Sequence, residues 1–356
     1  MNKINLAVIF GGCSSEYEVS LKSATSVIKN VNNEKYNLIL IGITREGKWY
    51  RYYGGIENII NDTWYNNKVV SSVISPCKDF KGLIEFANDR YSLTNIDVVF
   101  PILHGKNGED GTIQGLLDMA DIKYVGCNLI SSAICMDKDI AHTLVEKAGI
   151  RVAKSVVIIN EFNETESKSL IKEIGFPMYI KPTRAGSSIG ITKAHNYDEL
   201  VLGIKEALKH DNKVVVEENI VGNEIGCAVI GNYDLYVGEL DEIELNSDFF
   251  DYDEKYSLKK TKIFLPARIE VNKSINIKET AKRIYNILNC SGLARVDMFL
   301  NKEGEIVFNE VNTMPGFTDK SRYPNMLKIT GIKYEEIIDK LIDLAVEGDK
   351  NECKKH

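Results

Sequence analysis

Residues 293–312 read Leu293-Ala-Arg-Val-Asp-Met-Phe-Leu-Asn-Lys-Glu-Gly-Glu-Ile-Val-Phe-Asn-Glu-Val-Asn312. Apolar and polar residues alternate in two runs on either side of Gly304, which predicts a β-hairpin. A two-residue turn at 303–304 places Asp297 opposite Glu310, whereas a four-residue loop at 301–304 places Asp297 opposite Phe308. Either register puts Asp297 and Glu310 on one face, and the pattern leaves both turns open.

The two faces of this hairpin differ in chemistry, because side chains alternate along a strand. Arg295 joins Asp297 on one face, and Asn312 joins Glu310. Two carboxylates and an amide form a hard-oxygen ligand set that suits Mg²⁺, which usually also takes oxygens from substrate phosphates. An ordinary hairpin with its polar face in water is the alternative. The opposite face is expected to point to the core, and it holds Val296, Met298, Leu300, Val307 and Val311.

A second chemically suggestive stretch is Ile180-Lys-Pro-Thr-Arg-Ala-Gly-Ser-Ser-Ile-Gly190. Lys181 ends an apolar strand, and the small residues after it offer free N–H groups that can hold nucleotide phosphates. The Gly-x-x-x-x-Gly-Lys-Ser/Thr motif is absent, and a flexible surface loop is the alternative reading. Lys138, next to the helix cap Asp137, adds a cation at a helix N-terminus, where anions are favoured.

The first 128 residues alternate short apolar runs with helix-like stretches, which predicts a doubly wound parallel sheet. Strands are expected at 6–10, 38–44 and 96–103, and helices at 20–31 and after Thr112. The polar residues 51–91 predict loops and short antiparallel strands. Gly-rich turns at 11–16 and 104–111 follow strands, where open sheets bind ligands. Plain structural turns are the alternative reading, because every doubly wound fold needs them, and His104 would then hold its own loop through a backbone hydrogen bond.

The remaining residues predict two further units that mix helices and strands. A helix is expected from Asp137 to Gly149, and others at 167–174, from 198, at 277–288 and at 334–346. Strands are expected at 152–159, 177–181 and 214–217, and they dominate from residue 224 onward. We therefore expect an α/β protein of three domains, with residues 1–128, 129–218 and 219–356.

Composition narrows the class of protein. The chain has 356 residues, 44% of them hydrophobic, and a net charge of -7 from 44 basic and 51 acidic residues, which excludes disorder and argues against nucleic-acid or membrane partners. No apolar stretch reaches the roughly 20 residues that cross a bilayer, and the first apolar run is too short for a signal peptide. The seven scattered cysteines predict reduced thiols and a cytoplasmic location. We expect a small-molecule ligand.

Taken in order, these segments resemble the D-alanine–D-alanine ligase family of ATP-grasp enzymes over nearly the whole chain. The resemblance implies a doubly wound substrate-binding domain followed by a two-domain ATP-grasp fold. The ATP-grasp part is expected to be α+β. It implies ATP and Mg²⁺ as cofactors, with two metal ions and Mn²⁺ as a substitute, and a homodimer. The implied reaction phosphorylates the carboxylate of the first D-alanine, and the amine of the second amino acid then attacks the acyl phosphate.

The resemblance also assigns roles to residues of this chain. On the nucleotide side it implies that Lys138 and Lys181 bind phosphate and that Ser188 belongs to a glycine-rich phosphate loop. It implies that Glu217 and the backbone around Ile220 contact the base, that Glu224 holds the ribose, and that Lys255 belongs to a lid. The implied metal ligands are Asp297, Glu310 and Asn312. On the amino-acid side, it implies that Glu16 binds the ammonium group, that His104 belongs to a substrate-side turn and that Ser187 of the phosphate loop also reaches the substrate. Tyr256 would belong to the lid, and Arg295 with the N–H of Gly316 would stabilise the oxyanion.

One departure from the family concerns the second substrate. The ligases usually carry Ser-Leu where this chain has Ser321-Arg322, and that leucine lies against the methyl group of the second D-alanine. An arginine resembles the D-alanine–D-serine ligases of vancomycin resistance, in particular the VanG type, where Phe250 and Asp241 would line or support the same subsite. A charged hydrogen bond from Arg322 to a hydroxyl is worth about 1.5–3 kcal/mol, or about ten- to a hundredfold in selectivity.

The predicted function is therefore an ATP-dependent D-alanine–D-serine ligase that makes a modified peptidoglycan terminus for the cell wall and thereby for cell shape. Tyr256, where D-lactate-using relatives carry histidine, argues for an amine nucleophile. An ordinary D-alanine–D-alanine ligase, with Arg322 pointing to solvent, is the alternative. A nucleotide-binding regulator without turnover is a third hypothesis, and Arg295 argues against it because binding alone needs no oxyanion arginine.

Overall fold

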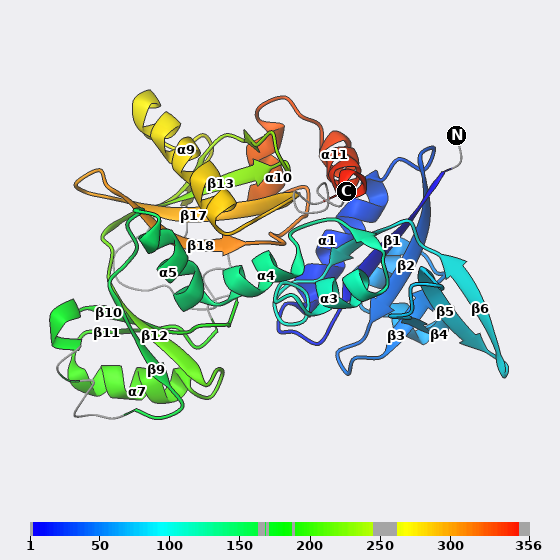
Figure 1. Cartoon of the computed structure of the whole chain (residues 1–356), viewed down its shortest axis with the longest axis horizontal. Coiled ribbons are helices and arrows are strands. Elements are labelled where there is room, and N and C mark those ends of the chain that lie inside the picture. Colours follow the sequence, from blue (N-terminus) through cyan, green and yellow to red (C-terminus); the bar gives the residue numbers. More distant parts are fainter. Residues whose placement is uncertain (1–2, 163–167, 169–170, 187–188, 245–261, 349–356) are drawn as a thin grey trace, which may run out of the picture.

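The computed structural model describes residues 3–162, 168, 171–186, 189–244 and 262–348 (Figure 1). Three sheets follow one another along the chain, with eight, four and six strands. In Figure 1 the first sheet lies on one side, and the second and third lie on the other side, one below the other. Among the described residues, no helix is both long enough and apolar enough to cross a bilayer.

The first sheet is doubly wound, as the sequence predicts. Its parallel part is built from β2 (Tyr36–Ile43), β1 (Ile4–Gly11), β7 (Val98–Ile102) and β8 (Lys123–Tyr124). The apolar residues 6–10 of β1 are all fully buried, because the strand is covered on both faces. Leu6, Val8 and Phe10 pack with α1 (Tyr17–Asn30), and the alternate residues pack with α3 (Thr112–Met119). The first helix begins three residues before its predicted start.

Residues 51–91 extend this sheet with antiparallel strands, which confirms the expectation for that stretch. The added strands are β3 (Trp49–Tyr52), β4 (Val69–Ile74), β5 (Gly82–Ala87) and β6 (Arg90–Asn95), with α2 (Ile56–Ile60) and the short helix η1 (Trp64–Asn66) between the first two. The buried Trp64 side chain lies edge-on to Phe10, so the extension is anchored to the core of the sheet.

Two consecutive helices lead from the first sheet to the second. They are α4 (Leu129–Met136), which the sequence analysis did not predict, and α5 (Lys138–Lys147). Asp137 caps α5 as expected, because its side chain accepts a hydrogen bond from the Ile140 N–H at 3.3 Å. The cap holds Lys138 in the first turn, and the Lys138 side chain is only 10% exposed.

The second sheet is antiparallel and small. Its strand order is β11 (Thr192–Ala194), β10 (Met178–Pro182), β12 (Lys213–Glu218) and β9 (Ser155–Ile159), and α7 (Tyr197–Ala207) covers one face. Alternation along β10 buries Met178 and Ile180 against α7 and directs Tyr179 and Lys181 to the other face. β10, which carries Lys181, is paired directly with β12, which carries Glu217.

The third sheet carries the predicted hairpin at its centre and edge. The strand order is β16 (Lys262–Phe264), β15 (Asp241–Glu244), β13 (Gly222–Ile230), β17 (Leu293–Asn301) and β18 (Ile306–Asn312), with β14 (Tyr236–Val237) also paired to β13. Helix α9 (Val271–Ile287) packs on one face, and α10 (Arg322–Lys328) and α11 (Tyr334–Glu347) connect this sheet to the first one.

Neither predicted turn of the hairpin is formed. Residues 302–305 join the strands, Leu300 pairs with Ile306, and a β-bulge lies between Asp297 and Met298. Met298 pairs with Phe308 whereas Asp297 pairs with Glu310, so Asn309 is the extra residue. The bulge restores the pairing of Asp297 with Glu310 that the shorter turn predicts.

The same bulge changes which residues face the core. Phe308 packs in the core cluster with Met298 and Val311, where the alternation predicts Val307. Val307 is fully buried but pairs with Phe299 on the other side of the hairpin. The prediction for Val307 was therefore wrong, because the extra residue reverses the alternation at this point of the strand.

Candidate active site

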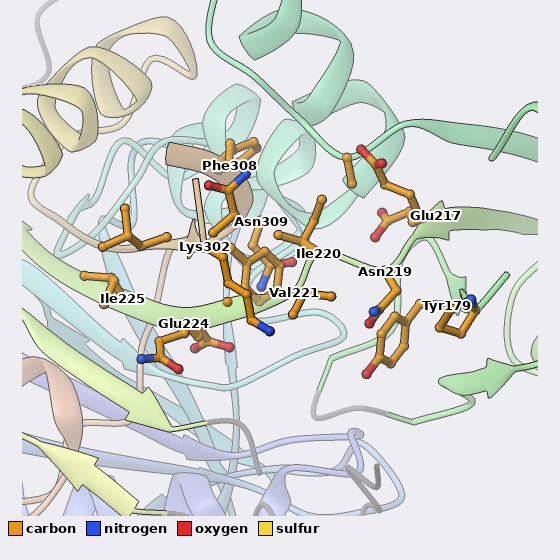
Figure 2. A pocket seen from close by; sticks show the side chains of 18 of the residues that line it. Tyr179, Glu217, Asn219, Ile220, Val221, Glu224, Ile225, Lys302, Phe308 and Asn309 are labelled. Carbon is orange, nitrogen blue, oxygen red and sulfur yellow. The ribbon is translucent and has the colours of Figure 1, made fainter. Parts of the chain in front are cut away.

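A cavity of about 820 Å³ separates the second sheet from the third. Figure 2 shows Tyr179 and Glu217, from β10 and β12, on one side, and Phe308 and Asn309, from the hairpin, on another. The cavity is lined by most of the residues predicted for the nucleotide, namely Lys181, Glu217, Ile220 and Glu224. Glu217, Ile220 and Glu224 come from one short stretch running from β12 into β13, and the fold brings Lys181 of β10 to the same space.

Lys181 and Glu217 form a buried ion pair at one end of this cavity. The distance from Lys181 Nζ to Glu217 Oε2 is 2.6 Å. Burial alone would lower the pKa of Lys181, but the charge and hydrogen bond of Glu217 raise it above its ordinary value. Burial would raise the pKa of Glu217, yet the charges of Lys181 and His142 lower it. Both groups are therefore charged at neutral pH.

The predicted metal face lies on the hairpin next to this cavity. Lys138 Nζ lies 3.5 Å from Glu310 Oε2, and it donates a hydrogen bond to the Ala185 carbonyl at 3.2 Å. Asp297 accepts hydrogen bonds from Arg295 Nη2 at 2.7 Å and from the Asn312 amide at 3.0 Å. The structure thus places the two predicted carboxylates opposite each other and each beside a side-chain cation.

The donor set fits a divalent cation of the hard-oxygen type. Asp297 and Glu310 are paired across the strands, and the Asn312 amide lies within hydrogen-bonding distance of Asp297. Burial raises the pKa of Asp297, although Arg295 and Arg322 oppose this effect. Among the described residues, no group of three or more histidine, cysteine or acidic side chains is arranged to hold a metal. A cation here would therefore depend on two carboxylates and an amide.

A smaller pocket, lined in part by Lys138, lies where the first sheet meets the hairpin. Its lining includes Glu16, Glu109, Lys138, Gly186 and Asn312. Glu16, predicted to bind the ammonium group, therefore faces the same space as the predicted metal face. Gly105 adopts φ +70°, which favours glycine, and a Cβ there would lie 2.6 Å from the Glu16 carboxylate. This pocket is the candidate amino-acid site.

Glu109 is a residue of this pocket whose individual role the sequence analysis missed. Its carboxylate accepts hydrogen bonds from the Gly105 N–H at 2.7 Å and from the Met314 N–H at 3.0 Å. Burial, together with the negative charge of Glu16, raises the pKa of Glu109 to about 8. The Gly-Glu-Asp-Gly turn marks the segment, but nothing in it indicates contact with residue 314, more than 200 positions away.

His104 connects segments instead of facing a pocket with a free ring nitrogen. Its Nδ1 lies 2.9 Å from the Met314 carbonyl and its Nε2 lies 3.1 Å from Ser23 Oγ. The residue is 3% exposed, and burial lowers its pKa. The backbone partner belongs to the loop after the hairpin and not to the histidine's own loop, so the alternative reading of His104 is corrected in that respect.

Arg322 is buried in a cluster of carboxylates at the start of α10. Its Nε and Nη2 donate to the two oxygens of Asp241 at 2.7 and 2.8 Å, and its Nη1 donates to Glu224 at 2.9 Å. Nη2 also lies 3.6 Å from Asp297 Oδ1. The Arg322 side chain is only 14% exposed, so the alternative in which it points to solvent is wrong.

The backbone around Arg322 is adapted to this cluster. A Cβ on Gly226 would lie 2.4 Å from both Arg322 Nη2 and Asp241 Oδ1, so only glycine leaves room for the pair. Ser321 Oγ lies 2.8 Å from Thr318 Oγ1 and accepts a hydrogen bond from the Thr318 N–H. A Cβ on Gly316 would lie 3.2 Å from Ser321 Oγ, so these two predicted site residues adjoin.

Five of the predicted site residues lie outside the described part of the chain. They are Ser187, Ser188, Phe250, Lys255 and Tyr256. The described cysteines are free, as expected, and Cys353 lies outside the described residues.

Comparisons with known proteins agree with this geometry. Family models described as D-ala D-ala ligase N-terminus and D-ala D-ala ligase C-terminus match residues 5–127 and 144–343. A D-alanine–D-alanine ligase of Caldicellulosiruptor bescii is 44% identical over 100% of this chain and 98% of the relative.

Solved structures of such ligases match the mixed α/β architecture. The VanG D-Ala:D-Ser ligase of Enterococcus faecalis is 52% identical, with a TM-score of 0.88 over 97% of this chain and 100% of that one. A Bacillus anthracis D-alanine–D-alanine ligase in complex with ATP is 27% identical, with a TM-score of 0.72 over 97% of this chain and 98% of that one. The fold is therefore that of the ATP-grasp ligases.

Proposed function

Because the chain belongs to the D-alanine–D-alanine ligase family, we propose that it joins D-alanine to D-serine at the expense of ATP, through a D-alanyl phosphate. The observation that carries the choice of D-serine is the buried, carboxylate-held Arg322 next to Ser321. The product would be a modified peptidoglycan terminus linked to vancomycin resistance. We further propose that the three sheets belong to domains 1–128, 129–218 and 219–356.

The cavity between the second and third sheets is suited to a nucleotide. Glu217 and the backbone around Ile220 would offer polar contacts for a base, and Glu224, which lines the same cavity, would hold a ribose hydroxyl. Lys181 is a buried cation that lines the cavity, and Lys138 is a buried cation 3.5 Å from Glu310. These two lysines would neutralise charge on the nucleotide phosphates and on the transferring phosphoryl group.

Asp297, Glu310 and Asn312 would hold Mg²⁺ on the hairpin, in contact with the phosphate end of the nucleotide. When bound, the ion supplies charge neutralisation for phosphoryl transfer. Arg295 lies beside Asp297 and Lys138 lies beside Glu310. The charges of Arg295 and Arg322 oppose the rise in the pKa of Asp297 that its burial causes.

In the proposed first step, the carboxylate of D-alanine attacks the terminal phosphorus of ATP, and ADP leaves. Glu16 faces the small pocket and would hold the ammonium group of this D-alanine. In the second step the free amine of the second amino acid attacks the acyl carbon, and phosphate leaves. Arg295 and the N–H of Gly316 would stabilise the oxyanion of the tetrahedral intermediate, a term that is typically worth a hundredfold or more in rate.

Arg322 supports D-serine as the second amino acid by its remaining hydrogen-bonding capacity. A guanidinium has five N–H donors. Within the described residues, two point at Asp241, one at Glu224 and one towards Asp297, which leaves one on Nη1. A side-chain hydroxyl can accept from that N–H and donate to a neighbouring carboxylate, whereas a methyl group can do neither. The cluster therefore favours the hydroxyl substrate.

A D-alanine–D-alanine ligase of ordinary cell-wall synthesis is the second candidate. It is favoured by the 44% identity to the Caldicellulosiruptor bescii ligase over the whole chain. A regulator without turnover is disfavoured by the buried Arg295 beside Asp297, because a binding protein gains nothing from that arginine.

The test uses the full-length protein with ATP, Mg²⁺ and D-alanine, with and without D-serine. Phosphate release and a mixed D-alanyl-D-serine product, identified by mass spectrometry, are expected, and addition of EDTA should abolish both until Mg²⁺ or Mn²⁺ is restored. Phosphate release with D-alanyl-D-alanine as the sole product rejects D-serine specificity. Absence of phosphate release with either amino acid rejects the ligase altogether.

A further inference from the structure

His142 lies on α5 between the second sheet and the hairpin, and the proposed mechanism does not use it. Its Nε2 lies 2.7 Å from the carbonyl oxygen of Asn309, the residue that the β-bulge leaves unpaired. Its Nδ1 lies 3.7 Å from Glu217 Oε1, and the ring stands edge-on to Phe308. The His142 and Glu217 side chains are 5% and 4% exposed, and both residues line the nucleotide cavity.

The protons of this arrangement can be assigned from the partners. A carbonyl oxygen can only accept, so Nε2 of His142 must carry a hydrogen. A neutral ring would then present a lone pair at Nδ1 to the carboxylate oxygen of Glu217. Within the described part of the chain, His142 Nδ1 and Glu217 Oε1 are buried atoms with no hydrogen-bond partner, whereas Glu217 Oε2 already accepts from Lys181.

One further proton, on His142 Nδ1, can give both of these buried atoms a partner. A hydrogen on Nδ1 gives His142 a donor that faces Glu217 Oε1, and closing the 3.7 Å gap by a few tenths of an ångström would give both of these atoms a partner. The geometry favours this state, since Glu217 Oε1 is the polar atom that faces Nδ1 and the Glu217 carboxylate carries a negative charge. The two oxygens of Glu217 would then be held by separate cations, Lys181 on one side and His142 on the other.

We propose that His142 is a positioning residue for nucleobase recognition, which bridges the Asn309 carbonyl and Glu217 Oε1 with its two N–H groups. This inference rests on the proposed function, which places a nucleotide in the cavity. Held in this way, the Glu217 carboxylate keeps a fixed acceptor direction at the base end. A purine with an amino group at position 6 can donate to such an acceptor, whereas a 6-oxo purine presents another acceptor and is repelled.

Two matched variants separate this role from simple packing. The amide nitrogen of His142→Asn falls near the place of Nδ1 and can still donate to Glu217. The amide nitrogen of His142→Gln falls near the place of Nε2 and can still donate to the Asn309 carbonyl. Both keep a polar side chain in the buried position, and thermal unfolding of each shows whether the fold is retained.

The measurement is the dissociation constant of ADP and of inosine diphosphate, by titration calorimetry on the full-length protein. We expect His142→Gln to lose roughly tenfold of the preference for ADP, the magnitude of one charged hydrogen bond, and His142→Asn to keep most of it. An unchanged preference in His142→Gln, or loss in His142→Asn alone, overturns the inference.

Phosphate release, followed in parallel, keeps this test distinct from that of the ligase. A wild-type protein that prefers ADP over inosine diphosphate, and loses this preference in His142→Gln, supports the positioning role even if it makes no dipeptide. A wild-type protein that makes the dipeptide but shows the same base preference in all three forms rejects the role of His142 alone.

Discussion

Replacement of Arg322 by leucine tests both the stability and the selectivity that the carboxylate cluster provides. Asp241 is 1% exposed and accepts two hydrogen bonds from Arg322, and its other described partner is the Gly226 N–H at 3.1 Å. Arg322→Leu therefore leaves a buried carboxylate without its cation. Loss of one partner of a buried ion pair costs about 3–5 kcal/mol in the free energy of unfolding.

The matched variant is Asp241→Asn, alone and combined with Arg322→Leu. Asp241→Asn removes the charge but leaves Arg322 with Glu224 and Asp297, so we expect a smaller cost of about 1.5–3 kcal/mol. In the double variant no buried charge remains at either place. Its cost should fall short of the sum of the single costs by about 0.5–3 kcal/mol, the usual coupling between residues in contact.

Urea unfolding of the four proteins measures this coupling, and competition between D-serine and D-alanine measures selectivity. We expect Arg322→Leu and the double variant to lose about ten- to a hundredfold of their preference for D-serine. Unfolding costs that simply add would show that Arg322 and Asp241 do not interact. An unaltered product ratio in the double variant would show that Arg322 does not select the second amino acid.

Two further variants address the amino-acid side of the site. Arg295→Lys keeps a cation beside Asp297 but loses the planar set of guanidinium donors, so kcat should fall by about a hundredfold with little change in thermal stability. Steady-state kinetics and a thermal melt measure the two quantities. A kcat equal to that of the wild type would show that Arg295 does not stabilise the oxyanion. Glu109 keeps its proton in the folded protein up to about pH 8, whereas an unfolded glutamate loses it near its ordinary value of 4.5, so the free energy of unfolding should fall as pH rises through this window. Glu109→Gln should flatten that slope in urea unfolding at several pH values, and an equal slope in both proteins would contradict the assigned pKa.

Most elements of the fold were predictable because their signals are local. The unbroken apolar run of β1 marks a strand that is covered on both faces, and the Asp137 cap marks the start of α5. The hairpin was predicted from alternation around Gly304, and so was the shared face of Asp297 and Glu310. The bulge at Asn309 was not, since it is an irregularity of pairing that neither strand announces by itself.

Local sequence patterns are enough to identify the chemical groups that this protein can offer, because each lysine, carboxylate and amide lies on a strand or at a helix start with its own local pattern. What these groups touch depends on tertiary packing. Arg322 meets Asp241 across 81 residues of sequence, Glu109 meets Met314 across 205, and His142 meets Asn309 across 167. Such contacts depend on how three sheets pack, and packing joins segments whose separation no short-range periodicity records.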